Sequence, residues 1–267
     1  MRMKTIEDDE IYEMLAESVD DGVRKVKKIL PEERVVKLCV NDRIYWLKQS
    51  ERHSNLKKRL RKGDGVEALK RERQNLISLE KRSIPVPQVL SFSNEYLVIS
   101  DCGITLSDLL KSPTYSSSEG AKAFFEAGRA LGQLHSDGIA LGRGKAKDFC
   151  WDGEKIYFID FEESPKEFCA AKYGRKNLYN FVYYMYFSAF NHKRDVNIEV
   201  RAFLSGYTSI KDTNIIQTIK AIRSWAKRRW WLAAISLPIA FLKPLGRSPD
   251  FKAIAPTLIL FSYFTPE

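Results

Sequence analysis

The chain has 267 residues, of which 44% are hydrophobic and 12% are aromatic. This apolar content is enough for one large domain or two closely packed lobes, and it excludes an intrinsically disordered chain. The net charge of +10 favours an anionic partner such as a phosphate, an acidic sugar, an acidic lipid or a nucleic acid. The four cysteines and three histidines are scattered, without the spacing of a disulfide framework or a zinc site.

Residues 1–102 are predicted to form a small β-rich lobe. Apolar positions at helical spacing predict a helix over residues 6–19. "RVVKLCV" and "RIYWLKQ" read as two strands of a hairpin that turns at Asn41-Asp42. "GVEALKRERQNLISLEKRS" has the pattern of an amphipathic helix, and "EYLVIS" that of another strand. The basic run at residues 57–62, "KKRLRK", reads as a solvated loop or as a contact for a phosphorylated glycolipid or an acidic leaflet.

Residues 103–267 are predicted to be mostly helical. "TLSDLL" begins a short helix capped by Thr105 or Ser107, and a long helix with a serine-rich start ends near Gly138. "CWDGEKIYFIDF" reads as a small hairpin that turns at its Asp-Gly pair. A β-rich lobe followed by a helical lobe predicts an α+β fold with two lobes.

The order of three charged residues suggests a phosphoryl-transfer site. Lys48 ends the second strand of the hairpin, Glu72 lies on the next helix, and Asp160 follows the apolar strand "IYFI". Together with "LHSDGI" and Asp148, this order resembles the protein-kinase-like superfamily. The closest resemblance is to its small bacterial branch, which includes the lipopolysaccharide core sugar kinases. The resemblance covers roughly residues 30–190.

The resemblance implies ATP as the phosphate donor and Mg²⁺ as the metal, with the nucleotide between the lobes. The residues implied to bind ATP are Lys48, Glu72, Asp101 and Cys102. In this scheme Lys48 holds phosphates and Glu72 orients it. Asp148 and Asp160 are implied both as catalytic residues and as metal ligands, since carboxylates suit a hard divalent ion.

The catalytic loop departs from the family pattern. Aligning "LGRGKAKD" with the kinase loop places Arg143 at the catalytic aspartate, with Lys145 two residues later. Glu162 replaces the glycine that normally follows Asp160-Phe161, and the first strands contain no Gly-rich loop. A general base contributes about 10²–10⁴-fold, and charge neutralisation dominates phosphoryl transfer. We therefore interpret Arg143 and Lys145 as catalytic groups that stabilise the transferred or acceptor phosphate in an unusual phosphotransferase.

Each of these residues also has a purely structural interpretation. Lys48 can be a solvated strand end, Glu72 part of a charged helix, and Arg143 part of a basic loop. His135 lies near a helix C-terminus, where packing and the helix dipole explain a histidine better than a base does. Asp160 is harder to explain in this way, because an acid after a buried strand is costly without a partner.

The C-terminal segment 225–245, "WAKRRWWLAAISLPIAFLKPL", combines tryptophans, basic residues and an apolar run. This composition favours peripheral contact with a membrane, and the alternative is a helix with Trp230 and Trp231 in the core. The apolar runs are shorter than the roughly 20 residues that span a bilayer. We expect a cytoplasmic protein that contacts the inner face of the cell membrane, without nucleic acid as a partner.

The sequence thus predicts an atypical ATP- and Mg²⁺-dependent phosphotransferase that acts on a hydroxyl group. The expected acceptor is an anionic glycolipid or sugar, such as a lipopolysaccharide core sugar. Three alternatives remain: a pseudokinase that binds nucleotide or a phosphorylated ligand without turnover, a nucleotidyl transferase, and a kinase-like factor associated with nucleic acid.

Overall fold

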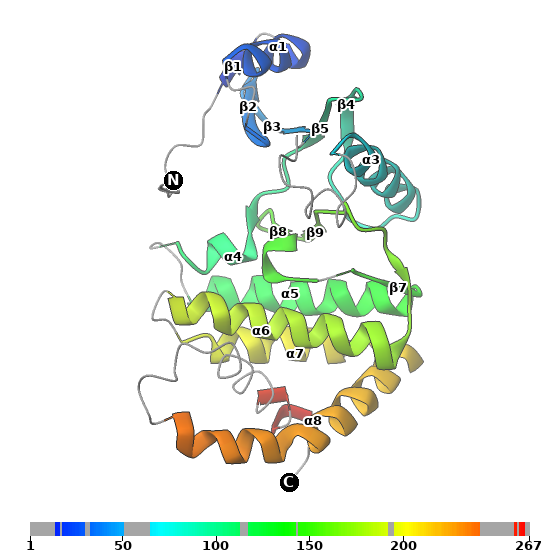
Figure 1. The fold of residues 1–267 in the computed structure, drawn as a ribbon, viewed down its shortest axis with the longest axis vertical. Coiled ribbons are helices and arrows are strands. Elements are labelled where there is room, and N and C mark those ends of the chain that lie inside the picture. Colours follow the sequence, from blue (N-terminus) through cyan, green and yellow to red (C-terminus); the bar gives the residue numbers. More distant parts are fainter. Residues whose placement is uncertain are drawn as a thin grey trace. The chain divides into compact units, whose positions relative to one another are not determined.

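The computed structural model describes residues 14–16, 18–29, 33–50, 65–112, 117–142, 144–191, 195–240, 259–260 and 262–264 (Figure 1). The chain divides into two compact units: Met1–Cys102 with Asp160–Ser164, and Gly103–Ile159 with Pro165–Glu267. The first is rich in strands and the second is larger and mostly helical, so the predicted α+β fold class is confirmed. Segment 160–164, which the sequence assigned to the second lobe, groups with the first unit.

The first unit is built on a five-stranded sheet with the order β1-β2-β3-β5-β4. Its strands are β1 (Met14–Ala16), β2 (Val35–Val40), β3 (Arg43–Gln49), β4 (Val89–Phe92) and β5 (Tyr96–Ser100). β1 runs parallel to β2, and the remaining neighbours are antiparallel. The predicted hairpin turn is present, since Asn41 and Asp42 both have positive φ, as a type I′ turn requires.

One local prediction for this unit is wrong. Residues 14–16 were expected in a helix, but they form β1 and pair with β2, Met14 lying opposite Leu38. Helix α1 (Val19–Ile29) begins only after Ser18, whose hydroxyl accepts a hydrogen bond from the backbone N–H of Asp21. Pairing with a neighbouring strand has overridden the helical periodicity of a short segment.

The two faces of the sheet serve different purposes, because successive side chains of a strand point to opposite faces. Val23 and Val26 of α1 pack against a cluster that includes Leu38, Leu47 and Val98. Lys48 is next to Leu47 in β3 and therefore points to the opposite face. On that face it meets helix α3 (Gly65–Lys81), whose Glu72 is its ion-pair partner.

The second unit contains most of the helices. Its elements are β6 (Ile104–Thr105), α4 (Leu106–Leu109), α5 (Ser117–Ser136), β7 (Ile139–Ala140), η1 (Ala146–Asp148), β8 (Phe149–Trp151), β9 (Ile156–Phe158), β10 (Lys166–Glu167), η2 (Ala170–Gly174), α6 (Arg175–Asn191), α7 (Asn197–Ser209) and α8 (Thr213–Ala240). Thr105 caps α4 as predicted, because its hydroxyl accepts the backbone N–H of Asp108 at 3.1 Å. Helix α5 ends at Ser136, close to the predicted end at Gly138.

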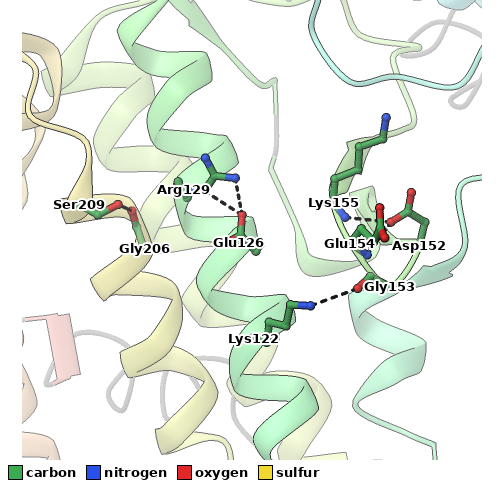
Figure 2. Close-up of polar contacts among 9 residues, drawn as sticks. All are labelled: Lys122, Glu126, Arg129, Asp152, Gly153, Glu154, Lys155, Gly206 and Ser209. Carbon is green, nitrogen blue, oxygen red and sulfur yellow. Dashed lines mark hydrogen bonds and ion pairs between the residues drawn. The ribbon is translucent and has the colours of Figure 1, made fainter.

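The β8–β9 hairpin turns where the sequence predicted it. Figure 2 shows the Asp152 carboxylate accepting the backbone N–H groups of Glu154 and Lys155, each at 2.8 Å. Lys122 of α5 reaches the carbonyl of Gly153 at 3.5 Å, which ties this turn to the helix. The turn is therefore held by its own aspartate and by α5.

Helices α5 and α7 pack with their backbones in close approach. A Cβ atom added at Gly128 would overlap the carbonyl oxygen of Phe203, and one added at Gly206 would overlap that of Phe125. Gly206 of α7 is drawn beside α5 in Figure 2. Phe181 of α6 stacks on Phe203, with ring centres 3.8 Å apart. The core of the larger unit is therefore aromatic, and it needs glycine at both crossing points.

Some predictions fall outside the described residues: the N-terminal part of helix 6–19, the basic run 57–62, and the side chains of Trp230 and Trp231. The backbone of α8 is helical as far as Ala240. Among the described residues, no helix has the length and apolar character required to cross a membrane.

Candidate functional site

Lys48 and Glu72 form a buried ion pair in the first unit. The side chain of Lys48 is 14% exposed and that of Glu72 only 1%, and Lys48 Nζ donates a hydrogen bond to Glu72 Oε1. Glu72 Oε2 is buried without a hydrogen-bond partner. Because an unpaired buried charge is strongly unfavourable, each of these two residues makes the burial of the other tolerable.

The spacing of apolar residues in α3 indicates that Glu72 is buried, although its charge suggests an exposed position. The buried residues of α3 are Gly65, Leu69, Glu72, Leu76 and Leu79. Their spacing of three and four residues is that of one helical stripe, with the glutamate at its centre. A carboxylate inside an apolar stripe points to a specific partner, which here is Lys48.

Asp101 and Cys102 lie at the end of the first unit, directly after β5. Trp46 of β3 donates its indole N–H to Asp101 Oδ1 at 2.6 Å. The side chain of Cys102 is buried, and its sulfur is 3.8 Å from the carbonyl oxygen of Ser100. The sequence reasoning missed Trp46, whose alternation with Lys48 in β3 was a signal that both share one face.

Asp160 is an exposed residue with an uncommon backbone conformation. Its φ is +67°, which aspartate tolerates better than most residues do. Its segment is attached to the first unit by two contacts: Asn75 of α3 donates to the carbonyl of Phe161 at 2.8 Å, and Glu162 forms an ion pair with Arg34. Glu162, which replaces the glycine of the family pattern, is thus an attachment point for the segment that carries Asp160.

The candidate catalytic loop of the second unit is fixed at its start by Asn177 of α6. The Asn177 side chain accepts the backbone N–H of Leu141 at 3.1 Å and donates to the Leu141 carbonyl at 2.9 Å. Gly144 has a φ of +60°, and a Cβ atom there would lie 3.2 Å from Asn177 Nδ2. The loop therefore requires glycine after Arg143, which itself lies outside the described residues.

His135 is buried and forms a hydrogen bond with Asn177. Its Nε2 is 3.0 Å from Asn177 Oδ1 and its Nδ1 is 2.8 Å from the Tyr207 hydroxyl. Since Asn177 Oδ1 can only accept, Nε2 carries the proton and Nδ1 accepts from Tyr207. Desolvation by burial lowers the pKa of His135 to about 4, although the hydrogen bond with Asn177 opposes this shift. His135 is therefore a neutral packing residue and does not act as a base.

Asp148 is held at the other end of the loop. It is 8% exposed, its Oδ2 accepts the backbone N–H of Lys145 at 3.0 Å, and its Oδ1 is 3.4 Å from Lys147 Nζ. Its carbonyl accepts the N–H of Ile159, the residue before Asp160, at 2.9 Å. Lys145 Nζ lies over the ring of Tyr184 at 4.4 Å. The turn η1 thus fixes Asp148 and Lys145 relative to one another.

The structure therefore brings together two sets of predicted residues, each within its own unit. Lys48 is joined to Glu72 in the first unit, and Lys145 to Asp148 in the second. Within the part of the chain that is described, no group of three or more His, Cys, Asp or Glu residues has a metal-binding arrangement. Mg²⁺ sites that use one or two carboxylates complete their coordination with substrate phosphates and water.

Known proteins share partial similarity with this chain. No family model matches the chain. An uncharacterized protein of Haemophilus influenzae is 30% identical over 146 residues, which is 54% of this chain and 60% of that protein. The chain thus spans less than two thirds of that relative. Among solved structures it is similar to WaaP in complex with acyl carrier protein, with 15% identity and a TM-score of 0.45 over 75% of this chain and 84% of that chain. Such a structural similarity is too low to support a conclusion, so the fold class rests on the chain's own elements.

Proposed function

We propose that this chain is an atypical ATP- and Mg²⁺-dependent phosphotransferase that acts on a hydroxyl group of a membrane-associated glycan such as a lipopolysaccharide core sugar. The observation that carries the proposal is the buried ion pair of Lys48 with Glu72. A lysine on a strand, oriented by a glutamate on the next helix, is the arrangement that kinases use to hold nucleotide phosphates.

The geometry of this pair fits a phosphate ligand. Lys48 has three N–H donors, and the contact with Glu72 Oε1 uses one of them. The remaining donors can bind phosphate oxygens while Glu72 restricts the rotamers of the lysine. In this scheme Trp46, through its hydrogen bond, fixes Asp101 at the position where the resemblance expects the nucleotide.

The proposal assigns two carboxylates to the metal site. Asp148 and Asp160 present oxygen atoms, the donors that Mg²⁺ prefers, and a bound Mg²⁺ would neutralise charge on the phosphates. The amide of Lys145 orients one oxygen of Asp148. Lys145 and Arg143 would add positive charge near the transferred or acceptor phosphate, where standard kinases have an aspartate base.

The proposed acceptor class rests on the sequence and the net charge, and not on contacts in the structure. It rests on the sequence resemblance to lipopolysaccharide core sugar kinases and on the net charge of +10, which favours an anionic substrate. Peripheral membrane contact through residues 225–245 belongs to the same proposal. Trp225, the first of these residues, packs against Tyr179 of α6 with ring centres 4.9 Å apart.

The experiment that tests the proposal is thermal unfolding with ATP, with Mg²⁺ and with both together, followed by a turnover assay. A ligand at about 100 times its dissociation constant stabilises a protein by about 2.7 kcal/mol. We expect a shift of this size with MgATP in the wild type and its loss in Lys48→Met. Transfer of label from the γ-phosphate of ATP, and not from its α-phosphate, to a lipopolysaccharide core acceptor would establish the reaction.

Asp160→Gly is a second test variant, chosen because the backbone of Asp160 has positive φ. Asp160→Gly removes the carboxylate but relaxes the backbone, whose φ is +67°, and this relaxation offsets stability that is lost with the side chain. We expect this variant to lose the Mg²⁺-dependent part of the stabilisation by ATP. If Asp160→Gly responds to MgATP as the wild type does, Asp160 is not a metal ligand and the proposed site is wrong.

The second candidate function is that of a pseudokinase, favoured by Arg143 at the position of the catalytic base. A pseudokinase would bind ATP through Lys48 and Glu72 without consuming it. Stabilisation by ATP together with no release or transfer of the γ-phosphate, across several sugar and glycolipid acceptors, would decide for this function. If neither ATP nor MgATP stabilises the wild type, both functions are refuted.

A further inference from the structure

A pocket of about 390 Å³ lies in the first unit, between helix α3 and the β4–β5 hairpin. Leu69, Lys70 and Arg73 line it from the helix, and Phe92, Asn94 and Leu97 line it from the hairpin. Its volume is within the range of about 300–1,000 Å³ that small-molecule sites occupy. None of these residues belongs to the candidate phosphotransferase site.

Arg73 gives the pocket its chemistry. Its guanidinium lies over the ring of Phe92, 3.1 Å from the ring centre, which fixes the plane of its donors. Its Nε is buried without a hydrogen-bond acceptor, and among the described residues it has no carboxylate partner. An unsatisfied buried donor is unfavourable, and a planar guanidinium is well suited to a carboxylate or phosphate. Arg73 is thus prepared for an anion that the described residues do not provide.

The remaining charges at the pocket do not compete with this role. Lys70 pairs with Glu67 at 3.2 Å on the exposed side of α3, so this carboxylate is already bound to a lysine. Glu95 of the hairpin is likewise paired with Lys27. The hydroxyl oxygen of Ser93, another lining residue, accepts the backbone N–H groups of Glu95 and Tyr96, which leaves its proton to donate. The polar groups therefore favour an anion.

The apolar part of the pocket defines the rest of the ligand. Leu69 and Leu97 are buried, at 7% and 1% exposure, and they supply an apolar surface. Phe92 is 46% exposed on β4, which is an edge strand of the sheet. A large exposed aromatic side chain beside an arginine is favourable for a flat apolar body that carries an anionic group.

We infer that the α3–hairpin pocket is a binding site for a small organic anion, whose carboxylate or phosphate binds Arg73 and whose flat apolar body packs against Phe92, Leu69 and Leu97. The occupant is a small molecule because the volume of about 390 Å³ matches one aromatic or heteroaromatic anion. This inference does not depend on the proposed phosphotransferase activity.

The test uses phenyl phosphate, with phenol as the neutral probe of the same ring and inorganic phosphate as the anion without a ring. Binding to the full-length chain is measured by titration calorimetry, and the site is located by changes in amide chemical shifts. We expect phenyl phosphate to bind at least about tenfold more tightly than either comparator, since both parts of the pocket then contribute. The shift changes should be largest at Arg73, Phe92 and Asn94.

Arg73→Gln and Lys81→Gln form a matched pair of variants. Both remove one positive charge from α3, but Lys81 lies in the exposed last turn, outside the pocket. We expect Arg73→Gln to weaken phenyl phosphate binding by about tenfold or more, and Lys81→Gln to leave it within about twofold. Phe92→Ser is a second variant whose exposed position protects the fold, and it should weaken the binding of phenyl phosphate more than that of inorganic phosphate.

Three outcomes would overturn the inference. Phenol that binds as tightly as phenyl phosphate would exclude an anion site. Arg73→Gln and Phe92→Ser that both bind like Lys81→Gln would exclude the pocket. Shift changes centred on Lys48 and Glu72 would show that the probe occupies the candidate nucleotide site instead.

Discussion

Acidification should destabilise this protein through His135. The unfolded chain binds a proton at this residue with a pKa near 6.5, whereas burial lowers the folded-state pKa to about 4. Between these values the unfolded state holds the proton and the folded state does not, so stability falls as the pH falls. At about 1.4 kcal/mol per pKa unit, the free energy of unfolding should decrease by about 2 kcal/mol between pH 7 and pH 5 because of this residue alone.

The assay is urea denaturation at several pH values between 7 and 5, on the wild type and on His135→Gln. The variant is expected to be less stable at pH 7, since it alters the contacts with Asn177 and Tyr207, but its stability should depend less on pH. The difference between the two curves removes the contribution of the carboxylates, which both proteins share. Parallel curves, or a His135 ring resonance that titrates between pH 6 and 7, would refute the neutral buried imidazole.

Three further predictions concern the fold. Gly206→Ala should destabilise the larger unit by about 3 kcal/mol, because its Cβ would lie 1.9 Å from the carbonyl oxygen of Phe125. A Cβ at Gly132 would lie 2.9 Å from the Ile210 side chain and 3.1 Å from the carbonyl oxygen of Tyr207, so Gly132→Ala should cost less in thermal denaturation; equal costs would contradict the close helix crossing. Asp42→Gly should stabilise the hairpin by about 0.5 kcal/mol in urea denaturation, since φ there is +61°, and a loss of stability would exclude the type I′ turn. Trp46→Phe should cost about 1–2 kcal/mol in the same assay by removing the 2.6 Å hydrogen bond to Asp101; a neutral result would make that bond unimportant.

Local sequence signals predicted the elements whose structure depends on nearby residues. The Asn41-Asp42 turn, the Thr105 cap and the turn at Asp152 are all determined by backbone conformation and side chains within a few positions. The helix expected over residues 6–19 failed at its described end, because Met14–Ala16 gains more from pairing with β2 than from helical periodicity. That gain comes from residues distant in the sequence, which no local window includes.

In the candidate site, too, some residues could be predicted from the sequence and others could not. Lys48 and Glu72 could be selected from their order along the chain, and the structure joins them. Asn177 could not be selected, since it is one of several polar residues in an aromatic helix and acts on a loop 36 residues away. Arg73 was equally inconspicuous within "KRERQNL", where its neighbours are also charged. Its difference from them is the aromatic ring of Phe92, which the hairpin brings to it.

The start of the candidate loop is held by a hydrogen-bond network of neutral groups. Leu141 is held through the amide of Asn177, and Asn177 through the neutral imidazole of His135, so no charged group takes part. A buried network of neutral groups fixes the backbone of the loop without adding a net charge. A protonated His135 would instead repel a divalent cation bound to Asp148. The charge of the loop is therefore set by Arg143, Lys145, Lys147 and Asp148. Because burial lowers the pKa of His135 to about 4, the imidazole adds no positive charge to the loop at neutral pH.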